Sequence, residues 1–282
     1  MKKILFLILM LSSLCSSAVA SGAPVAENLR VISLYPGHSD NIFAMGGEKI
    51  LAALSENDDE DLLPDLPRLS LRDTAEKFLA LRPDVVVTRS FAMRLNPNLY
   101  EILERAGVKI INLDPPSWNE FENYLKVLAD SLGLDSEKAI EKLKAIVPAS
   151  SILTPNCFIE ATSKEIHTCA PDSWAANLIK LAGGINIASE AKPLRAGSSI
   201  AAWGVERVLK SCENKNLDIY IIQTGAMNHA SLKDFYAREW TEVLKNSGVK
   251  VYEVPEKYLS RPSLLGLEKG QEILRKIFES DD

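Results

Sequence analysis

Short runs of apolar, β-branched residues alternate along the chain with longer segments whose apolar residues recur at helical spacing. RVISL at residues 30–34, DVVVTR from residue 84 and LDIYII from residue 217 are typical of buried strands. Each run is followed by a segment of helical period and then by another apolar run. This alternation predicts an α/β protein built from strand–helix–strand units.

One such unit occurs twice. Residues 81–114 contain LRPDVVVTRS, a helix-like stretch and AGVKIINLD, and residues 217–255 contain LDIYIIQTGA, another such stretch and SGVKVYEVP. In both copies an Asp opens the first apolar run and Gly-Val-Lys introduces the second. Two similar units about 130 residues apart predict two similar α/β lobes. A cleft between lobes is a common place for a small ligand.

The strand rhythm is interrupted between the two copies. Residues 117–147 carry two segments of helical period, separated by Gly133, and a Ser or an Asp starts each segment. The predicted fold class is therefore α/β, with two Rossmann-like lobes joined by a helical spacer. The expected parts are an N-terminal lobe at 29–115, a linker at 116–148 and a C-terminal lobe at 149–282.

The N-terminus has the pattern of an export signal. Two lysines precede an apolar run that is too short to span a bilayer, and A-V-A ending at Ala20 supplies a small-residue cleavage site. We predict a signal peptide over residues 1–20 and a mature protein in the periplasm. Lipidation at Cys15 is the alternative, which Leu14 immediately before it disfavours.

Charge and cysteine content narrow the function classes. The chain of 282 residues has a formal net charge of −6, and loss of two lysines with the signal peptide makes it −8. An acidic exported protein is a poor candidate for binding nucleic acid or anionic membranes. Among the remaining cysteines, Cys157 and Cys169 are the first candidates for a disulfide, Cys212 is another partner, and three buried free thiols are an equal alternative.

Motifs of catalysis and nucleotide binding are missing from the sequence. There is no G-x-S-x-G elbow, G-x-G-x-x-G or P-loop, and His38, His167 and His229 form no close metal-binding pair. We therefore expect a binding protein, with no cofactor or metal of its own, rather than an enzyme. An exported metal-dependent hydrolase and a bare metal-ion binding protein are the alternatives, and both require the three histidines to converge.

Residues that follow the predicted strands are the candidates for ligand binding, because ligands of open α/β sheets collect at the carboxyl ends of the strands. Aromatic residues there offer flat apolar contact, and arginines hold carboxylates or phosphates. Such a rim suits a bulky, partly anionic molecule. The candidates are Tyr35, His38, Arg89, Arg94, Trp118, Trp174 and Arg261. The first copy has the Arg89/Arg94 loop where the second has the QTGAMNH loop. We expect these two loops to determine which ligand binds.

Several motifs together resemble one known family. RVISLYPGHSDNIFAMGG, AEKFLALRPDVVV and AGVKIINLDP, then NLIKLAGGINIA, GVERVLKSCENKNLDIYII and RPSLLGLEKGQEIL, are similar to the periplasmic binding proteins that feed ferric-siderophore, haem and cobalamin ABC importers. The resemblance covers about residues 29–278. It implies two lobes on a long rigid helix and capture of a metal chelate, either a ferric siderophore-like complex or a corrinoid. The partner implied is a membrane permease with its ATPase, and we expect a monomer.

The resemblance also implies docking on the permease through one exposed Glu of each lobe. Motif position assigns these to Glu76 in TAEKFLALRPD and Glu206 in WGVERVL. The sequence departs from the family in two places. The expected linker helix, at about 135–147, is shorter than the family's, and IEATSKEIHTCAPDSW replaces a more Gly-rich stretch.

Overall fold

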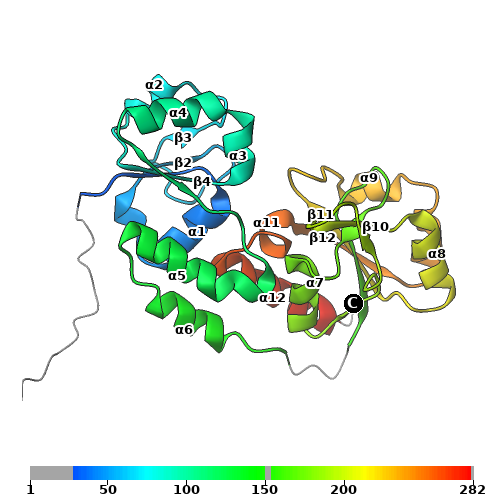
Figure 1. The fold of residues 1–282 in the computed structure, drawn as a ribbon. Coiled ribbons are helices and arrows are strands. Elements are labelled where there is room, and N and C mark those ends of the chain that lie inside the picture. Colours follow the sequence, from blue (N-terminus) through cyan, green and yellow to red (C-terminus); the bar gives the residue numbers. More distant parts are fainter. Residues whose placement is uncertain (1–27, 150–153, 281–282) are drawn as a thin grey trace, which may run out of the picture.

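The computed structural model describes residues 28–149 and 154–280, and two parallel sheets form the centres of its two lobes (Figure 1). The first sheet has the order β3-β2-β1-β4-β5 and the second has the order β12-β11-β6-β8. A small antiparallel sheet, β7-β10-β9, belongs to the second lobe. The predicted α/β class with two Rossmann-like lobes is confirmed. The predicted signal peptide, with Cys15, lies outside the described residues.

The bounds of the elements are as follows. The first sheet contains β1 (Val31–Ser33), β2 (Leu51–Ser55), β3 (Arg68–Leu69), β4 (Val85–Thr88) and β5 (Lys109–Asn112). The second lobe contains β6 (Asn156–Glu160), β7 (Thr168–Cys169), β8 (Ile185–Asn186), β9 (Lys192–Pro193), β10 (Ile200–Ala202), β11 (Ile219–Thr224) and β12 (Lys250–Pro255). The helices are α1 (Pro36–Ala44), α2 (Ala75–Leu79), α3 (Ser90–Leu95), α4 (Pro97–Arg105), α5 (Phe121–Leu132), α6 (Glu137–Ala145), α7 (Trp174–Leu181), α8 (Val205–Glu213), α9 (Leu232–Tyr236), α10 (Thr241–Asn246), α11 (Glu256–Leu259) and α12 (Leu264–Glu279), with short 3-10 turns η1 (Glu48–Ile50) and η2 (Trp118–Glu120). No helix within the described residues is long and apolar enough to cross a membrane.

The Asp that opens each copy of the repeat has the same role in both lobes. β4 pairs in parallel with β5, and β11 pairs in parallel with β12. A carboxylate oxygen of Asp84 accepts the Arg30 N–H at 2.8 Å. In the second lobe, one of Asp218 accepts the Asn156 N–H at 2.7 Å. Each Asp therefore fixes the start of the neighbouring strand, β1 or β6, relative to its own.

The Gly-Val-Lys of each copy ends a helix. Gly107 and Gly248 have φ angles of +87° and +76°, a region that residues with a side chain rarely adopt. The N–H of the Val that follows donates to the carbonyl five residues earlier, at 3.0 Å in the first copy and 3.1 Å in the second. This closure satisfies a terminal carbonyl of the helix and directs the chain into the next strand.

Arg94 lies in helix α3 and Arg89 immediately precedes that helix, so the loop expected there is wrong. The carboxylate of Asp114, which follows β5, accepts the Ser90 N–H at 2.8 Å and the Ser90 hydroxyl at 2.7 Å. A carboxylate that accepts a donor of the first turn stabilises a helix start. A residue distant in sequence therefore decides the conformation of this segment.

Of the alternatives for the cysteines, the structure has three buried free thiols and no disulfide between Cys157 and Cys169. All three cysteines of the described residues, Cys212 included, are free and buried. Cys157 lies in β6 of the large sheet and Cys169 in β7 of the small sheet, so the two are not on paired strands. Burial raises the pKa of the Cys169 thiol to about 11, which keeps it protonated and unreactive.

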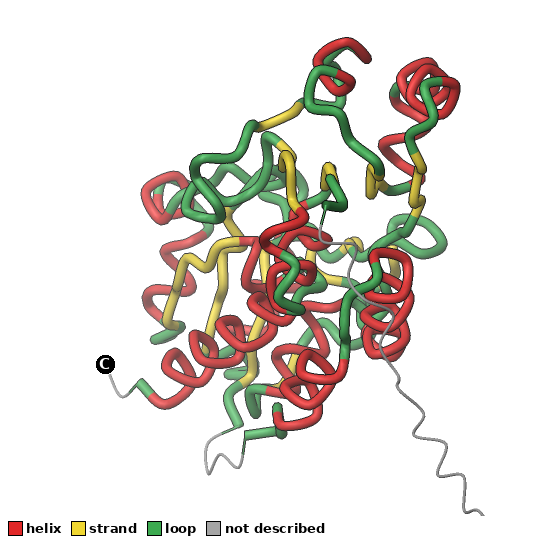
Figure 2. The backbone as a smooth tube through the Cα atoms, turned by 90° about the vertical axis from the view of Figure 1, so that its left-hand side faces the viewer, coloured by secondary structure: helices red, strands yellow, loops and turns green. Residues whose placement is uncertain are grey.

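One apolar cluster runs through both lobes. It joins side chains of β1 and α1, of the spacer helices α5 and α6, and of β6, α7 and α12. Separate clusters cover the outer face of each sheet. In Figure 2 the helices can be followed on either side of the strands. A core that two lobes share resists their separation, because separation would expose apolar surface to water.

The spacer consists of two helices separated at Gly133, as predicted, and its second helix is shorter than the expected 135–147. Helix α6 has 9 residues, or about 14 Å, and it packs against α5 beneath the lobes (Figure 1). The helix that contacts both lobes is α12, with 16 residues or about 24 Å. It packs on α1 of the first lobe, on α7 of the second and on α6. Helix α12 therefore connects the two lobes together with the predicted linker at 116–148.

Two glycines let the turn after β12 pack directly on α12. A Cβ at Gly270 would overlap the carbonyl oxygen of Tyr258, and one at Gly266 would lie 2.8 Å from that of Lys257. The spacing of four residues places both glycines on one face of the helix. The motif RPSLLGLEKG thus encodes a close contact between α11 and α12.

We expect Gly270→Ala to lower the free energy of unfolding by about 1–3 kcal/mol, because the added methyl group has no room. Urea unfolding followed by circular dichroism measures this change. The neighbouring Lys269→Ala, at an exposed side chain, is the matched control and should change the value by less than about 0.5 kcal/mol. Equal stability of both variants would contradict the close packing.

Candidate functional site

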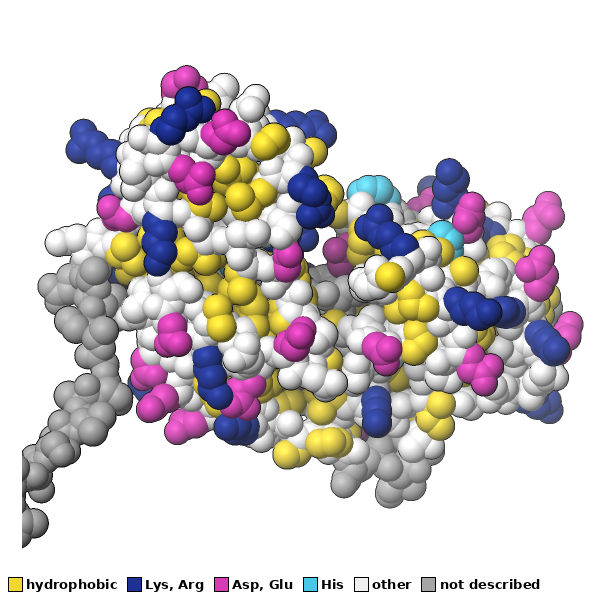
Figure 3. All heavy atoms as spheres, in the orientation of Figure 1, with side chains coloured by type: hydrophobic (Ala, Val, Ile, Leu, Met, Phe, Trp, Pro, Cys, Tyr) yellow, Lys and Arg dark blue, Asp and Glu magenta, His cyan; other side chains and the backbone are white. Residues whose placement is uncertain are grey.

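The two lobes face each other across a notch. Helix α3, which follows β4, lies on the first-lobe side of it, and α11, which follows β12, lies low between the two lobes (Figure 1). Figure 3 shows the notch as a hollow with basic side chains on both of its sides. Carboxyl ends of parallel strands therefore supply the two walls, as expected for a ligand site of an α/β protein.

An arginine stacked between two aromatic rings forms the wall in the first lobe. The Arg89 guanidinium lies 4.6 Å from the ring centroid of Tyr35 and 5.3 Å from that of Phe91. Tyr35 follows β1, and the other two residues follow its parallel neighbour β4. The Phe91 side chain is exposed, at 52% of its surface. The stack presents a flat, apolar and cationic surface to the notch.

Two further features of this wall affect what it can bind. Burial raises the pKa of Tyr35 to about 12, so its hydroxyl stays protonated at neutral pH and is able to donate a hydrogen bond. Arg94, in the last turn of α3, is exposed. The wall therefore carries the Arg89 cation and a phenol donor, and the helix beside it carries the exposed Arg94. Phe91 was not among the predicted site residues, although its position directly after β4 was the available signal.

His38 lies behind this wall rather than on it. Its ring is fully buried, 5.1 Å from the Tyr35 ring and 6.1 Å from the Tyr124 ring. Burial lowers the pKa of His38 to about 4, so the imidazole is neutral. Its Nε2 lies 2.9 Å from the carbonyl oxygen of Leu113, which only accepts, so the proton is on Nε2. The histidine thereby anchors α1 to the chain that follows β5.

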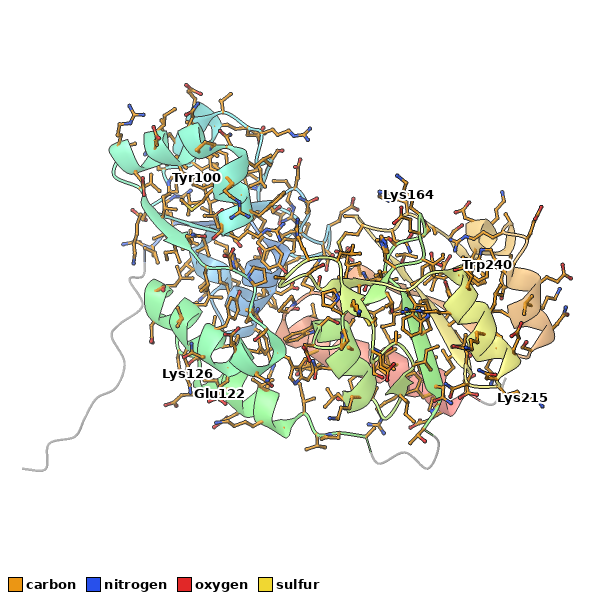
Figure 4. All side chains as sticks on the ribbon, turned by 45° about the vertical axis from the view of Figure 1, so that its right-hand side comes forward. Tyr100, Glu122, Lys126, Lys164, Lys215 and Trp240 are labelled. Carbon is orange, nitrogen blue, oxygen red and sulfur yellow. The ribbon has the colours of Figure 1, made fainter. Side chains whose placement is uncertain are left out.

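A pocket of about 440 Å³ forms the wall in the second lobe. It lies between the turn that follows β6 and the turn that follows β11. Lys164 projects from the first of these turns at the rim of the lobe (Figure 4). The lining residues are Thr162, Ser163, Lys164, Met227, Asn228, His229, Ala230, Asp234 and Arg238.

A buried carboxylate beneath this pocket is fully satisfied from within the lobe. Glu160 accepts hydrogen bonds from the Arg238 guanidinium at 2.7 and 3.1 Å. It also accepts from the Tyr220 hydroxyl at 2.6 Å and from Asn228 Nδ2 at 3.2 Å. Donors on every side make a buried charge tolerable, and here they join β6, β11 and α9's C-terminal turn. The single acidic residue in the apolar run CFIEA was the sequence signal for this cluster.

Two tryptophans meet where the spacer contacts the second lobe. The rings of Trp118 and Trp174 lie 4.8 Å apart, and Phe121 lies 4.9 Å from Trp174. Trp174 is only 6% exposed and belongs to the shared apolar cluster, whereas Trp118 is half-buried. A cavity of about 260 Å³ opens where α5, α6, α7 and α12 meet beside these rings.

Arg261 is engaged by carboxylates rather than presented to the notch. Its Nη1 lies 3.2 Å from Asp40 and 3.4 Å from Asp59, both in the first lobe. The arginine side chain is 15% exposed. Of the predicted binding residues, the structure thus groups Tyr35, His38 and Arg89 around one wall, pairs the two tryptophans, and places Arg261 in an ion pair.

The three histidines do not converge. His167 binds within its own turn, to Thr162 at 3.0 Å and to Glu165 at 3.1 Å, whereas His38 is buried in the first lobe. Within residues 28–149 and 154–280, no group of three or more His, Cys, Asp and Glu side chains is placed to hold a metal ion. The arrangement that the hydrolase and bare-metal alternatives require is therefore not found in the described residues.

Glu76 and Glu206 occupy equivalent positions in the two lobes. Each is exposed, in the first turn of α2 or α8. A hydrogen bond from the Thr74 hydroxyl lowers the pKa of Glu76, which keeps its carboxylate charged. Both glutamates are thus available as negative charges on the surface of the protein.

Comparisons with known proteins agree with this architecture. No family model matches the chain. An uncharacterized ABC transporter substrate-binding lipoprotein of Bacillus subtilis (strain 168) is 19% identical over 266 residues, which cover 89% of this chain and 81% of that protein.

Solved structures of periplasmic proteins share the fold. A possible iron-binding (periplasmic solute-binding) protein from Staphylococcus epidermidis has a TM-score of 0.70 at 18% identity, covering 90% of this chain and 100% of its own. The periplasmic vitamin B12 binding protein of Vibrio cholerae has a TM-score of 0.59 at 19% identity, with 90% and 99% covered. At such identities the likeness shows the fold, and it confirms the fold predicted from the family resemblance.

Burial of His38 gives stability a pH dependence. Its pKa is 6.5 in the unfolded chain and about 4 in the fold, so the unfolded chain binds more protons between these values. This contribution is fully present above pH 6.5 and is lost as the pH falls through 4, by about 3 kcal/mol in total. In urea unfolding between about pH 7 and pH 4, His38→Asn should lose less stability than the parent.

The matched control is Leu128→Ala, which destabilises the buried core without removing a titratable group. Its stability should fall with pH as steeply as that of the parent. Asp58, whose pKa burial raises to about 6, titrates in all three proteins and cancels in the comparison. An equal pH dependence in His38→Asn and the parent would contradict a neutral, buried ring.

Proposed function

We propose that this protein is the exported solute-binding component of an ABC importer. It captures a metal chelate, either a ferric siderophore-like complex or a cobalamin-type corrinoid, and delivers it to a membrane permease with its ATPase. It makes and breaks no covalent bond. The observation that carries the proposal is the Tyr35–Arg89–Phe91 stack at the carboxyl ends of β1 and β4, which faces the notch of a periplasmic binding protein fold.

The chemistry of the first wall suits a large, flat and partly anionic ligand. Aromatic rings provide area for a chelate's organic surface, and the Arg89 and Arg94 guanidiniums pair with its carboxylates or phosphates. The protonated Tyr35 hydroxyl adds one donor. We assign ligand contact in this lobe to Tyr35, Arg89, Arg94 and Phe91, and we assign a further contact to Trp118 of the spacer.

The second wall contributes an exposed apolar group and polar donors. Met227 is 44% exposed at the rim of the 440 Å³ pocket, beside His229 and Lys164. Methionine adapts its shape to a bulky ligand, and a lysine ammonium attracts an anion. The cluster under the pocket already neutralises Glu160, so it does not oppose an anionic ligand. The two walls are therefore both basic and both partly apolar.

Three of the predicted binding residues support the walls from behind. His38 holds α1 and contacts the ring of Tyr35, and Trp174 packs against Trp118. Arg261 binds the first lobe through carboxylates. We propose that these side chains set the shape of the site without touching the ligand.

Export and location form part of the proposal. The signal pattern over residues 1–20 directs the chain out of the cytoplasm, and cleavage after Ala20 leaves a monomer in the periplasm. The relative from Bacillus subtilis is described as a lipoprotein, which supports a location outside the cytoplasmic membrane. A lipid on Cys15 is the alternative form of attachment.

Ligand binding is tested with the purified protein, to which cobalamin, haem and ferric siderophores are added separately. Quenching of tryptophan fluorescence reports binding near Trp118. We expect one class of chelate to quench, and Arg89→Ala to weaken its binding about ten- to hundred-fold, because a charge-assisted contact and the ring stack are lost.

The matched control is Arg105→Ala. This arginine ends α4 just before β5, at the end of the sheet where the strands begin, and its side chain is 74% exposed. The control should bind like the parent. Absence of quenching by every chelate would overturn the chelate assignment, and equal affinity of the Arg89 and Arg105 variants would overturn the assigned wall.

Docking through Glu76 and Glu206 makes a separate prediction. Two charges on separate lobes orient a protein on its partner and speed encounter. With the cognate importer in liposomes, we expect Glu76→Ala and Glu206→Ala each to raise the concentration for half-maximal ATPase stimulation about tenfold, without changing chelate affinity. Glu101→Ala, at an exposed Glu of α4, is the control. Stimulation at the parent concentration by the double variant would contradict this mode of docking.

A further inference from the structure

A short segment links the two walls of the notch. It runs from Glu256 to Leu264, includes α11, and is called the junction segment below. Its first set of contacts is with the first lobe. Lys257 Nζ lies 3.2 Å from Asp59, and Arg261 Nη1 lies 3.2 Å from Asp40. Asp59 also accepts Arg261 at 3.4 Å, so the two basic residues share one carboxylate.

A buried amide adds hydrogen bonds to these ion pairs. Asn41, in α1, donates from Nδ2 to the carbonyl oxygen of Pro262 at 3.0 Å. Its Oδ1 accepts the N–H of Leu264 at 3.1 Å. Asn41 is fully buried, and both bonds join the first lobe to backbone more than 200 residues later. A bidentate amide of this kind fixes orientation as well as distance.

The second contact group is with the strand and turn that carry the other wall. The Ser260 hydroxyl donates to Gln223 Oε1 at 2.5 Å, at the end of β11. The carboxylate of Glu256 accepts the N–H of Met227 at 3.4 Å. Gly225 leaves room for this carboxylate, because a Cβ there would lie 2.6 Å from Glu256 Oε2. The junction segment therefore holds the QTGAMNH turn directly.

The ion pair between Asp40 and Arg261 is largely buried, so its loss would cost more free energy than the loss of an exposed pair. The Asp40 side chain is 2% exposed and that of Arg261 is 15% exposed. Burial, with the nearby Asp59 charge, raises the pKa of Asp40, and Arg261 opposes that effect. A buried carboxylate without its partner is costly, so each member of the pair constrains the other. Exposed pairs such as Arg275 with Glu279 lack this property.

We propose that the junction segment is the positioning element of the site, which sets the distance and angle between the two walls through Arg261 and Asn41. α1 begins directly after Tyr35 and carries Asp40 and Asn41, so the contact of the junction segment with α1 fixes the first wall. Its contacts with Gln223 and Met227 fix the second. Arg261 is thus a positioning residue of the site and makes no ligand contact.

This role explains how the two lobes keep a fixed arrangement although the spacer helix α6 is short. α6 is a single helix of 9 residues, and the chain after it is irregular from 146 to 155 where described. The junction segment lies on α12 through Gly266 and Gly270, and α12 spans both lobes. The ion pairs of the junction segment, the Asn41 amide and α12 together therefore hold the lobes in place of one rigid connecting helix.

The inference concerns the protein without ligand, so its test is independent of the proposed function. Spin labels are placed at Glu101→Cys and Glu213→Cys, on exposed positions of α4 and α8, after the three buried native cysteines are replaced by Ala. Pulsed electron paramagnetic resonance then gives the distribution of distances between the lobes. The parent should give one narrow distribution.

Three variants in this labelled background carry the test. Arg261→Met and Asp59→Asn should broaden the distribution and shift it, and Arg261→Lys should restore part of the narrow one. Asp59 is 23% exposed, so its variant keeps the fold even if loss of Arg261 does not. Arg261→Met should also lower Tm by about 6 °C or more, because it leaves Asp40 buried and unpaired.

The control is Arg275→Met, which removes an exposed ion pair within α12 and should keep the parent distribution. Parent-like distributions in the folded Arg261→Met and Asp59→Asn variants would overturn the proposal. If the distributions broaden while no chelate quenches the parent, the junction segment stands and the proposed function fails. If a chelate quenches the parent while the variants keep the parent distribution, the proposed function stands and the junction-segment proposal fails.

Discussion

The apolar cluster that the two lobes share is the constraint on which the other features depend. β1 and α1 of one lobe and β6 and α7 of the other bury side chains in it, together with α5, α6 and α12. Because separation would expose this surface to water, the lobes keep a fixed relation and the notch persists without a ligand. A pre-formed notch lowers the entropic cost of binding, which is consistent with the proposed capture of a ligand.

Two buried carboxylates, Glu160 and Asp40, are paired inside the protein with Arg238 and Arg261. A third, Asp58, has no cationic partner among the described residues, and burial raises its pKa to about 6. The cations that remain unpaired at the notch are Arg89, stacked on rings, and the exposed Arg94 and Lys164 among the described residues. An acidic chain thus presents a basic notch, and net charge alone conceals the chemistry of the site.

Much of the fold was predictable because local signals and tertiary structure agree. The Asp that opens each repeat and the Gly-Val-Lys that closes its helix have the same hydrogen bonds in both lobes. The site was less predictable. Tyr35 and Arg89 lie at the wall, as position after a strand indicates, but His38 and Trp174 have the same kind of position and are buried. Position after a strand does not say which way a side chain points.

The sequence by itself determined the two α/β lobes, the order of their strands and helices and the residues at the strand ends, because these follow from periodicity and from glycine and Asp signals within a few residues. Only the tertiary structure decided that Arg261 pairs with Asp40, that Asp114 starts α3, that the cysteines are free, and that α12 shares the work of the spacer. Each of these depends on groups brought together from distant parts of the chain, and their partners are fixed by packing rather than by neighbours in sequence.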